Sequence, residues 1–96
     1  MEQIEKIKTQ VQAYFDKNAA FYIPYFALLG EEDKNHIVNI GTSIICTRHN
    51  VGYPGGSFVQ SIVNNDLQGT FATADDININ AIRFYLMMMH NMGVTL

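Results

Sequence analysis

The chain has one cysteine, few charged side chains and no long hydrophobic run. Cys46 alone cannot form an intramolecular disulfide, and the polar N-terminal segment MEQIEKIKTQVQ lacks the apolar stretch of a secretion signal. The most apolar segment, FYLMMMHNMGV, is interrupted by His90 and Asn91 and is shorter than the roughly 20 residues that span a bilayer. We therefore expect a cytoplasmic protein in a reducing compartment, with no membrane partner.

Charge is scarce, and its balance is negative. Only 16% of the residues are charged, against roughly 25% in typical soluble domains, which suggests that another copy covers some apolar surface. We therefore expect a homo-oligomer. Six Lys and Arg against nine Asp and Glu give a net charge of −3, which argues against binding to long nucleic acid. A small anionic ligand stays open, because folding or oligomerisation could bring two arginines together.

The apolar content of the chain is high enough to form a core. Apolar residues make up 48% of the 96 residues, which argues against intrinsic disorder and for a single domain over residues 1–96. Apolar positions recur mostly at helical spacing, and no internal repeat is visible. The sequence therefore predicts an all-α fold, a small compact helical domain of about four helices.

Two helices are expected in the first half of the chain. Residues 2–21 form an amphipathic pattern that ends before Pro24. A second helix is predicted over residues 31–48, because its acidic first turn complements the helix dipole. The β-branched residues within 38–47 leave a strand as the competing interpretation. The expected inward stripes are Ile4, Ile7, Val11 and Tyr14 or Phe15 in the first helix, and Ile37, Ile40 and Ile44 in the second.

The second half is expected to hold a loop, a short helix and a longer helix. The turn-rich segment 49–56 is the loop, and Ser57 is predicted to cap a short helix that ends at residues 64–66. Residues 67–73 are expected to be irregular or to form a short turn, with Leu67 and Phe71 facing inward. A last helix begins near Thr73 or Asp75 and ends before Gly93, with a predicted inward stripe of Ile79, Ile82, Leu86 and Met89.

The loop and the helix start after it carry the main candidate ligand site. Gly55, Gly56 and Ser57 would present unpaired backbone N–H groups beside the positive end of a helix, an arrangement that binds phosphate. Gly-Gly before Ser is also an ordinary tight start of a helix, so both interpretations stay open.

Three side chains near this segment complete the candidate set. They could grip a phosphate, bond a base edge and stack on its face, and they are Arg48, Asn50 and Tyr53. The alternative is that Arg48 interacts with the last carbonyls of its own helix and that Tyr53 packs over the loop.

A second polar cluster lies at residues 64–66. Asn65 and Asp66 could touch ligand hydroxyls, although helix capping is the favoured interpretation for Asn and Asp at a helix end. Asp75 and Asp76 likewise have a sufficient explanation in the helix dipole. The histidines and Cys46 show no zinc-type spacing, and no nucleophile motif is present. We therefore expect no metal, no cofactor and no enzymatic activity.

The second half resembles a widespread group of small proteins from phages and mobile elements. Their pattern is a Pro-Gly-Gly turn with an aromatic residue, then Asn-Asp-Leu, then Ala-Asp with a following Asn, and a final helix that ends in Asn. The matching positions in this chain are Pro54, Gly55, Gly56, Phe58, Asn65, Asp66, Leu67, Ala74, Asp75, Asn78 and Asn91. The match covers roughly the second half of the chain.

The resemblance implies a non-catalytic phage accessory protein in the host cytoplasm. Among such proteins are the anti-CBASS sponges, which bind cyclic di- or trinucleotide immune signals and keep the host effectors silent. By this resemblance, residues 55–57 with Arg48 would hold phosphate, Tyr53 would stack on a base, and Asn65 and Asp66 would recognise polar edges. The alternative is a protein–protein inhibitor or assembly factor that acts on a host or phage protein through an apolar, aromatic surface.

Overall fold

The computed structural model describes residues 2–93, and all regular structure in that part of the chain is helical. Its elements are α1 (Glu2–Tyr22), the short 3₁₀ helix η1 (Phe26–Leu28), α2 (Glu31–Arg48), α3 (Ser57–Val63), α4 (Leu67–Thr73) and α5 (Asp76–Asn91). The all-α prediction is confirmed, with five α-helices among the described residues instead of about four. The alternative strand over residues 38–47 is wrong, because α2 runs through it without interruption.

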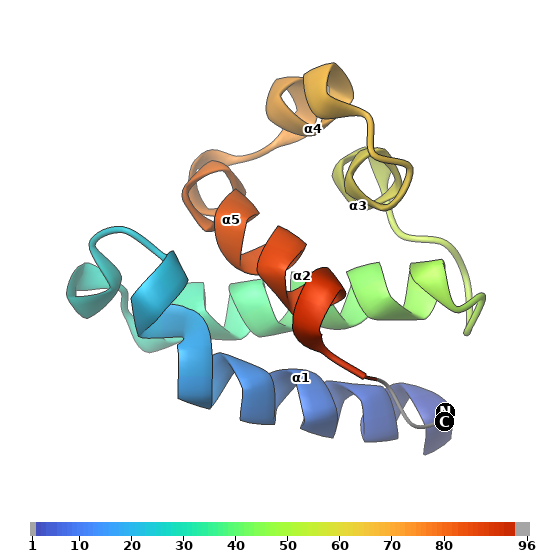
Figure 1. The fold of residues 1–96 in the computed structure, drawn as a ribbon, viewed down its shortest axis with the longest axis horizontal. Helices are drawn as coiled ribbons and strands as arrows, with labels where there is room; N and C mark the ends of the chain where they lie inside the picture. The colour runs from blue at the N-terminus through green and yellow to red at the C-terminus, as the bar shows by residue number, and fades with distance from the viewer. Residues whose placement is uncertain (1, 94–96) are drawn as a thin grey trace.

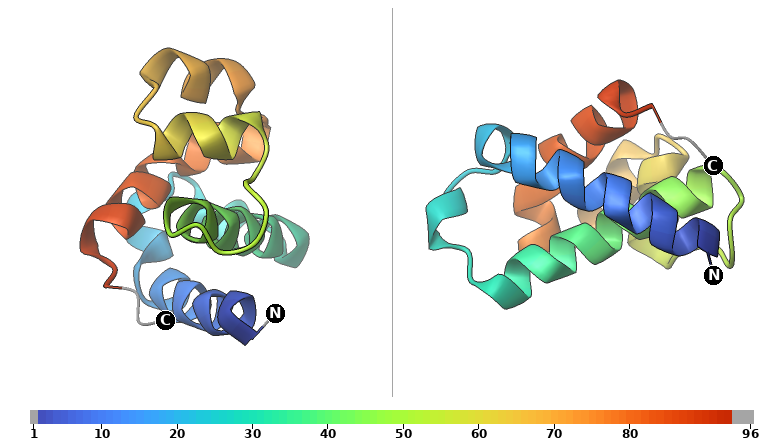
Figure 2. Two further views of the ribbon diagram at one scale, coloured as in Figure 1. Left: turned by 90° about the vertical axis from the view of Figure 1, so that its right-hand side faces the viewer. Right: turned by 90° about the horizontal axis from the view of Figure 1, so that it is seen from below.

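Three long helices make the main packing unit. α1 and α2 run in opposite directions, and α5 packs against both (Figures 1 and 2). The predicted stripe of α1 is confirmed at Ile7, Val11 and Phe15, which are all buried. Gly41 of α2 lets the helices approach, since a Cβ there would lie 3.1 Å from Val11 Cγ1 and 3.3 Å from Met88 Sδ.

Aromatic rings link the helices through the core. Phe84 of α5 is fully buried and meets Phe15 of α1 edge to face, with ring centroids 5.6 Å apart. On the other side of α5, Tyr85 meets Phe58 of α3 in a similar contact at 5.8 Å. These contacts attach α3 to the long-helix unit.

α3 and α4 pack together as a separate layer, with α3 against α2 (Figures 1 and 2). Residues 67–73 form α4 and are not irregular as predicted, because the Asp66 carboxylate caps the helix start. The expected inward orientation of Leu67 and Phe71 is also wrong: Leu67 is 72% exposed and Phe71 is half-exposed. Because α4 packs mainly against α3, only Thr70 of this helix is buried.

The buried face of α5 differs from the predicted one. Ile82 is buried as expected, but Ile79 and Leu86 are half-exposed. The buried residues of α5 are Asn78, Ala81, Ile82, Phe84, Tyr85 and Met88. Since this helix is apolar around most of its circumference, helical spacing alone fits either face. Contact with both α1 and α2 selects the one that is buried.

Candidate functional site

The loop after α2 holds two of the predicted site residues, Asn50 and Tyr53. Its backbone is anchored by buried Val51, whose N–H donates to the Cys46 carbonyl over 2.8 Å. Asn50 adopts a left-handed backbone conformation (φ 57°) that turns the chain. Tyr53 is 95% exposed and does not pack over the loop. The alternative interpretation of Tyr53 is therefore wrong, and its ring is free to meet a ligand.

The predicted phosphate-binding segment is partly occupied by internal contacts. The Gly55 N–H donates to Thr47 Oγ1 over 2.9 Å, so it is not available to an anion. A Cβ at Gly55 would lie 2.5 Å from Ser43 Oγ and 2.6 Å from Val59 Cγ1, so only glycine fits. Gly56, not Ser57, occupies the N-cap position of α3, and α3 has no side-chain cap. Ser57 as cap is thus wrong, and the two glycines chiefly allow a tight start of the helix.

Arg48 connects helices instead of serving the loop. Its Nη1 donates to the Met89 carbonyl of α5 over 2.9 Å, between the last turns of α2 and α5. We predicted contact with carbonyls of its own helix as the alternative, and the structure shows a carbonyl of another helix. This hydrogen bond ties down one end of α5.

Asn65 and Asp66 lie at the far end of α3 from the glycine segment. α3 has seven residues, which at about 1.5 Å per residue puts the two clusters about 10 Å apart. Asp66 Oδ1 accepts a hydrogen bond from the Gly69 N–H over 3.0 Å, so Asp66 caps the start of α4 and not, as predicted, the end of the preceding helix. Asn65 has a left-handed backbone conformation (φ 59°) that turns the chain between α3 and α4. The structure therefore does not bring the eight candidate residues into one cluster.

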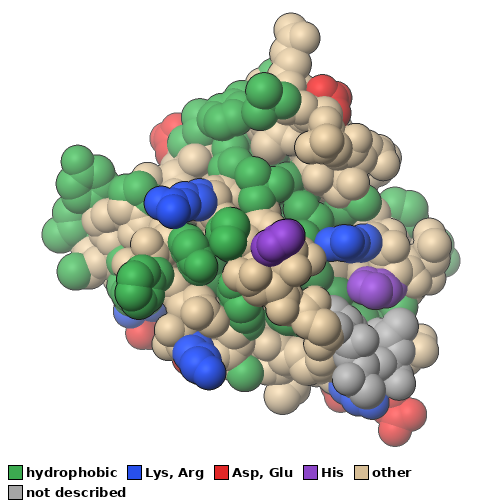
Figure 3. Space-filling model, in the orientation of Figure 1, with side chains coloured by type: hydrophobic (Ala, Val, Ile, Leu, Met, Phe, Trp, Pro, Cys, Tyr) green, Lys and Arg blue, Asp and Glu red, His purple; other side chains and the backbone are tan. Residues whose placement is uncertain are grey.

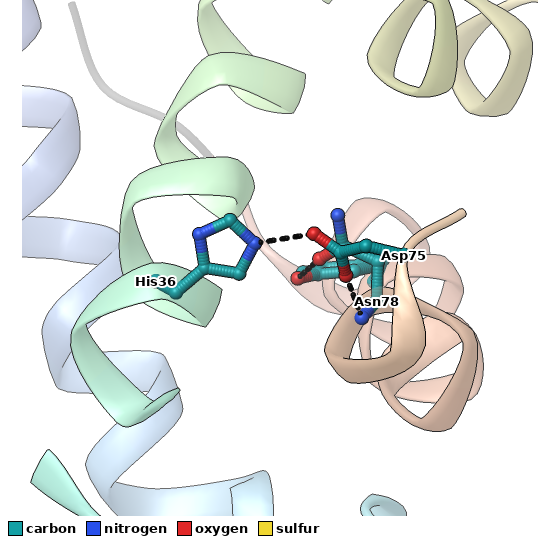
Figure 4. Close-up of polar contacts among 4 residues, drawn as sticks. His36, Asp75 and Asn78 are labelled. Carbon is teal, nitrogen blue, oxygen red and sulfur yellow. Dashed lines mark hydrogen bonds and ion pairs between the residues drawn. The ribbon is translucent and has the colours of Figure 1, made fainter. Parts of the chain in front are cut away.

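A polar network that sequence analysis missed joins α2 to the start of α5 (Figure 4). Asp75 caps α5 by accepting from the Asn78 N–H over 2.7 Å, and its other oxygen lies 3.0 Å from His36 Nε2. The buried Tyr85 hydroxyl donates to Asn78 Oδ1 over 2.7 Å. Burial raises the pKa of Tyr85 far above its usual range, and the negative charge of Asp75 raises it further. The hydroxyl therefore stays protonated and keeps donating to Asn78.

Five of the eleven residues of the resembling pattern have packing or hydrogen-bonding roles within the fold. Gly55 allows close packing on α2, and Phe58 packs against Tyr85. Asp66 and Asp75 cap helices, and Asn78 accepts from Tyr85. In this chain, these five positions stabilise α3, α4 and α5 and their packing.

A further hollow of the described surface lies elsewhere, between the end of α1 and α5. We call it the apolar groove. It is lined by residues 20–27, by Phe71 of α4 and by five residues of α5, namely Ile79, Asn80, Ile82, Arg83 and Leu86, and it has a volume of about 820 Å³. Phe21 is 86% exposed, Tyr25 is 78% exposed and Phe71 is 49% exposed. Figure 3 shows hydrophobic side chains gathered over η1 and over α4 on this face. Beyond the apolar composition of the chain, no sequence pattern indicated this groove.

The turn beside the groove is held in a strained conformation. Tyr25 has left-handed backbone angles (φ 58°, ψ 30°), which cost a non-glycine residue about 1–2 kcal/mol. Asn80 Nδ2 of α5 donates to the Pro24 carbonyl over 2.7 Å and fixes the turn. Strained residues that the surrounding structure holds in place often mark functional sites. Here the strain keeps the Tyr25 ring at the rim of the groove.

A smaller pocket of about 340 Å³ lies between α1, α2 and the loop. Tyr53 and Lys8 are among the residues that line it, together with Asn39 and Ser43. An exposed tyrosine, a lysine and two residues with hydrogen-bonding side chains therefore border one pocket. Lys8 and Asn39 were not among the predicted site residues, because they are far from Tyr53 in sequence.

Comparison of the chain with family models, with curated proteins and with solved structures gave no match. Within residues 2–93, no three His, Cys, Asp or Glu side chains are grouped so that they could hold a metal ion. No helix in that part of the chain is long and apolar enough to cross a membrane. Burial raises the pKa of the Cys46 thiol, which lowers its nucleophilicity at neutral pH.

Proposed function

We propose that this protein is a non-catalytic binding protein whose apolar groove takes up an apolar segment of another protein. The observation that carries the proposal is the gathering of strongly exposed Phe21 and Tyr25 and half-exposed Phe71 around one groove. Exposed aromatic rings are costly to leave in water and are enriched at protein interfaces. This corresponds to the second of the two functions expected from the sequence.

The exposed area is large enough to support binding. Side chains of Phe and Tyr bury about 150–250 Å² each, so the exposed fractions of these three rings amount to about 400 Å². Contiguous apolar patches of about 300–600 Å² are the largest on typical monomers and are often functional. At about 25 cal/mol per Å², covering the rings contributes about 10 kcal/mol. That is comparable to the entropic cost of association, about 4–15 kcal/mol.

The groove is also preorganised for a partner. The hydrogen bond from Asn80 to the Pro24 carbonyl fixes the turn, and the guanidinium of Arg83 lies 5.4 Å from the centre of the Tyr22 ring. Side chains that are already ordered lose less conformational entropy on binding. The groove therefore offers its apolar surface without having to rearrange.

Site-specific photo-crosslinking would test this proposal. A photoreactive phenylalanine would replace Phe21 in the groove or, as a control, Leu67, which is 72% exposed on α4 outside the groove. In cells that naturally produce the protein, we expect one protein to crosslink from position 21 and not from position 67. The crosslink should disappear when Leu86→Asp is added. Equal crosslinking from both positions, or from neither, would contradict the proposal.

A second candidate function is the nucleotide sequestration expected from the resemblance. The smaller pocket favours it, because Tyr53 could stack on a base while Lys8 meets a phosphate. Calorimetric titration with cyclic di- and trinucleotides tests it, followed by chromatography to see whether the bound nucleotide is recovered intact. Tyr53→Ala and Lys8→Gln should each weaken binding at least tenfold. Absence of heat across the whole panel would exclude sequestration of these ligands.

A further inference from the structure

The apolar groove contains one charged side chain, and it has no charged partner. Arg83 is the sole charged residue among the groove-lining residues, all of which the structure describes. Its guanidinium lies over the Tyr22 ring and forms no ion pair within residues 2–93. The side chain is exposed, so water now solvates it.

Along α5, Arg83 lies between two apolar residues of the groove. Ile79, Arg83 and Leu86 are spaced four and three residues apart, so they share one face of α5. Both apolar residues line the groove together with Arg83. A partner that covers Ile79 and Leu86 would therefore remove Arg83 from water as well.

The position of Arg83 among apolar residues determines which chemical groups a partner must carry. Burying a guanidinium group without an anion is costly, so a purely apolar segment would lose much of what the rings contribute. A carboxylate can form a bidentate, charge-assisted pair with Arg, and that pair strengthens as water is excluded. Resting on the proposed function, we propose that the occupant is an amphipathic helix of another protein with one Asp or Glu among its apolar contacts, placed to meet Arg83.

Two features favour a helix from another protein over a second copy of this chain. Ile79, Ile82 and Leu86 are three and four residues apart on α5, and side chains so spaced form a ridge against which another helix can pack. In a symmetric dimer, each groove would face the other, and the two Arg83 side chains would bring like charges together. No groove-lining residue is acidic, so neither copy would supply the missing carboxylate.

A displayed library of helical peptides tests the inference with the full chain. The peptides, about 18 residues or five turns long, keep three apolar positions at i, i+4 and i+7 and vary all others. Selection on the wild-type protein should enrich Asp or Glu at one position. Replacing that residue with Gln should weaken binding by about tenfold or more, whereas the same replacement should have little effect on binding to the Arg83→Gln variant. Arg83→Lys should restore part of the preference.

The other outcomes separate this inference from the proposed function. Peptides whose binding is lost in Leu86→Asp but which show no acidic preference would overturn the inference and leave the groove function standing. Failure to select any peptide that depends on Leu86 would overturn both. Analytical ultracentrifugation adds a further check: a wild-type dimer that Leu86→Asp dissociates would show that a second copy occupies the groove, against the inference. Thermal unfolding would show that the variants used are folded.

Discussion

The two sides of α5 are built in opposite ways. Toward α3 and the start of α5, Phe58 is buried, Gly55 packs tightly, and Asn78 and Tyr85 satisfy each other by a hydrogen bond. Toward the end of α1, aromatic rings stay exposed around the apolar groove, and Arg83 lies there without an ion pair to any residue within 2–93. We call the first side the scaffold side and the second the groove side.

The contrast shows that the chemical type of a residue does not by itself indicate its role in the protein. The glycines, Asp and Asn in the second half look like ligand-binding residues, but most of them hold helices in place. Residues such as Phe71, Ile79 and Leu86 look like core, yet they lie at the surface. Polar groups at helix ends satisfy the backbone before they can serve a ligand, whereas exposed apolar groups have no internal role to fulfil.

The largest expected difference is between replacing a phenylalanine with alanine on the scaffold side and making the same replacement on the groove side. Phe58→Ala should lower the free energy of unfolding by about 3 kcal/mol, because a buried ring is replaced by a cavity. Phe21→Ala should change it by less than about 0.5 kcal/mol, since that ring is already in water. Urea denaturation measures both. Similar losses in the two variants would break the distinction between scaffold side and groove side.

A pair of neighbouring glycines tests the packing of the scaffold side. Gly55→Ser should cost about 2 kcal/mol, because its Cβ would clash with Ser43 and Val59. Gly56→Ser is the control: no atom lies within 4 Å of a Cβ there, and Ser is a good N-cap residue. Chemical denaturation should therefore show a loss at one position and no loss at the next. Equal effects would mean that the tight contact at Gly55 is not important.

Because the Tyr85 hydroxyl is buried, the free energy of unfolding should decrease in alkaline solution. Tyr85→Phe leaves the Asn78 oxygen without its donor and should cost about 1–2 kcal/mol at neutral pH. The pKa of Tyr85 is raised in the folded state, so the folded protein keeps the hydroxyl proton more tightly than the unfolded chain does. The resulting contribution to the free energy of unfolding is complete below the unfolded-state pKa of about 10, and it is lost as the pH rises above that value.

Denaturation at a series of pH values checks this dependence. Above pH 10, the wild type should lose up to about 1.4 kcal/mol per pH unit more than Tyr85→Phe. Parallel curves for the two proteins would contradict a buried, neutral Tyr85.

The smallest effects are expected at the pair that joins α2 to α5. Asp75→Ala should cost about 1 kcal/mol, because it removes the cap of α5. His36→Ala should cost less than about 0.5 kcal/mol, since both members of the His36–Asp75 pair are partly exposed. Thermal unfolding of the two variants compares them. If His36→Ala proved as costly as Asp75→Ala, the ion pair and not the cap would be what Asp75 contributes.

Local features of the sequence were sufficient to predict most helices. The stripe of Ile7, Val11 and Phe15 placed α1, and the acidic first turn placed α2. Asp75 was one of two residues predicted to begin the last helix, and in the structure its carboxylate caps α5. Each of these signals acts between residues within a few positions of one another, so the sequence can express it without knowledge of the fold. The cap at Asp66 belongs to the same kind, although the helix that it starts was not expected.

The sequence by itself therefore determined an all-α fold with low charge, the starts of α2 and α5 and the inward face of α1. The tertiary structure alone decided which face of α5 is buried, that α4 lies at the outside, and that Phe21, Tyr25, Arg83 and Leu86 meet in one groove. The physical reason is distance along the chain. Hydrogen-bonded caps and helical stripes are local, whereas burial depends on which distant helices cover a surface, and apolar periodicity does not reveal that when a helix is apolar on several sides.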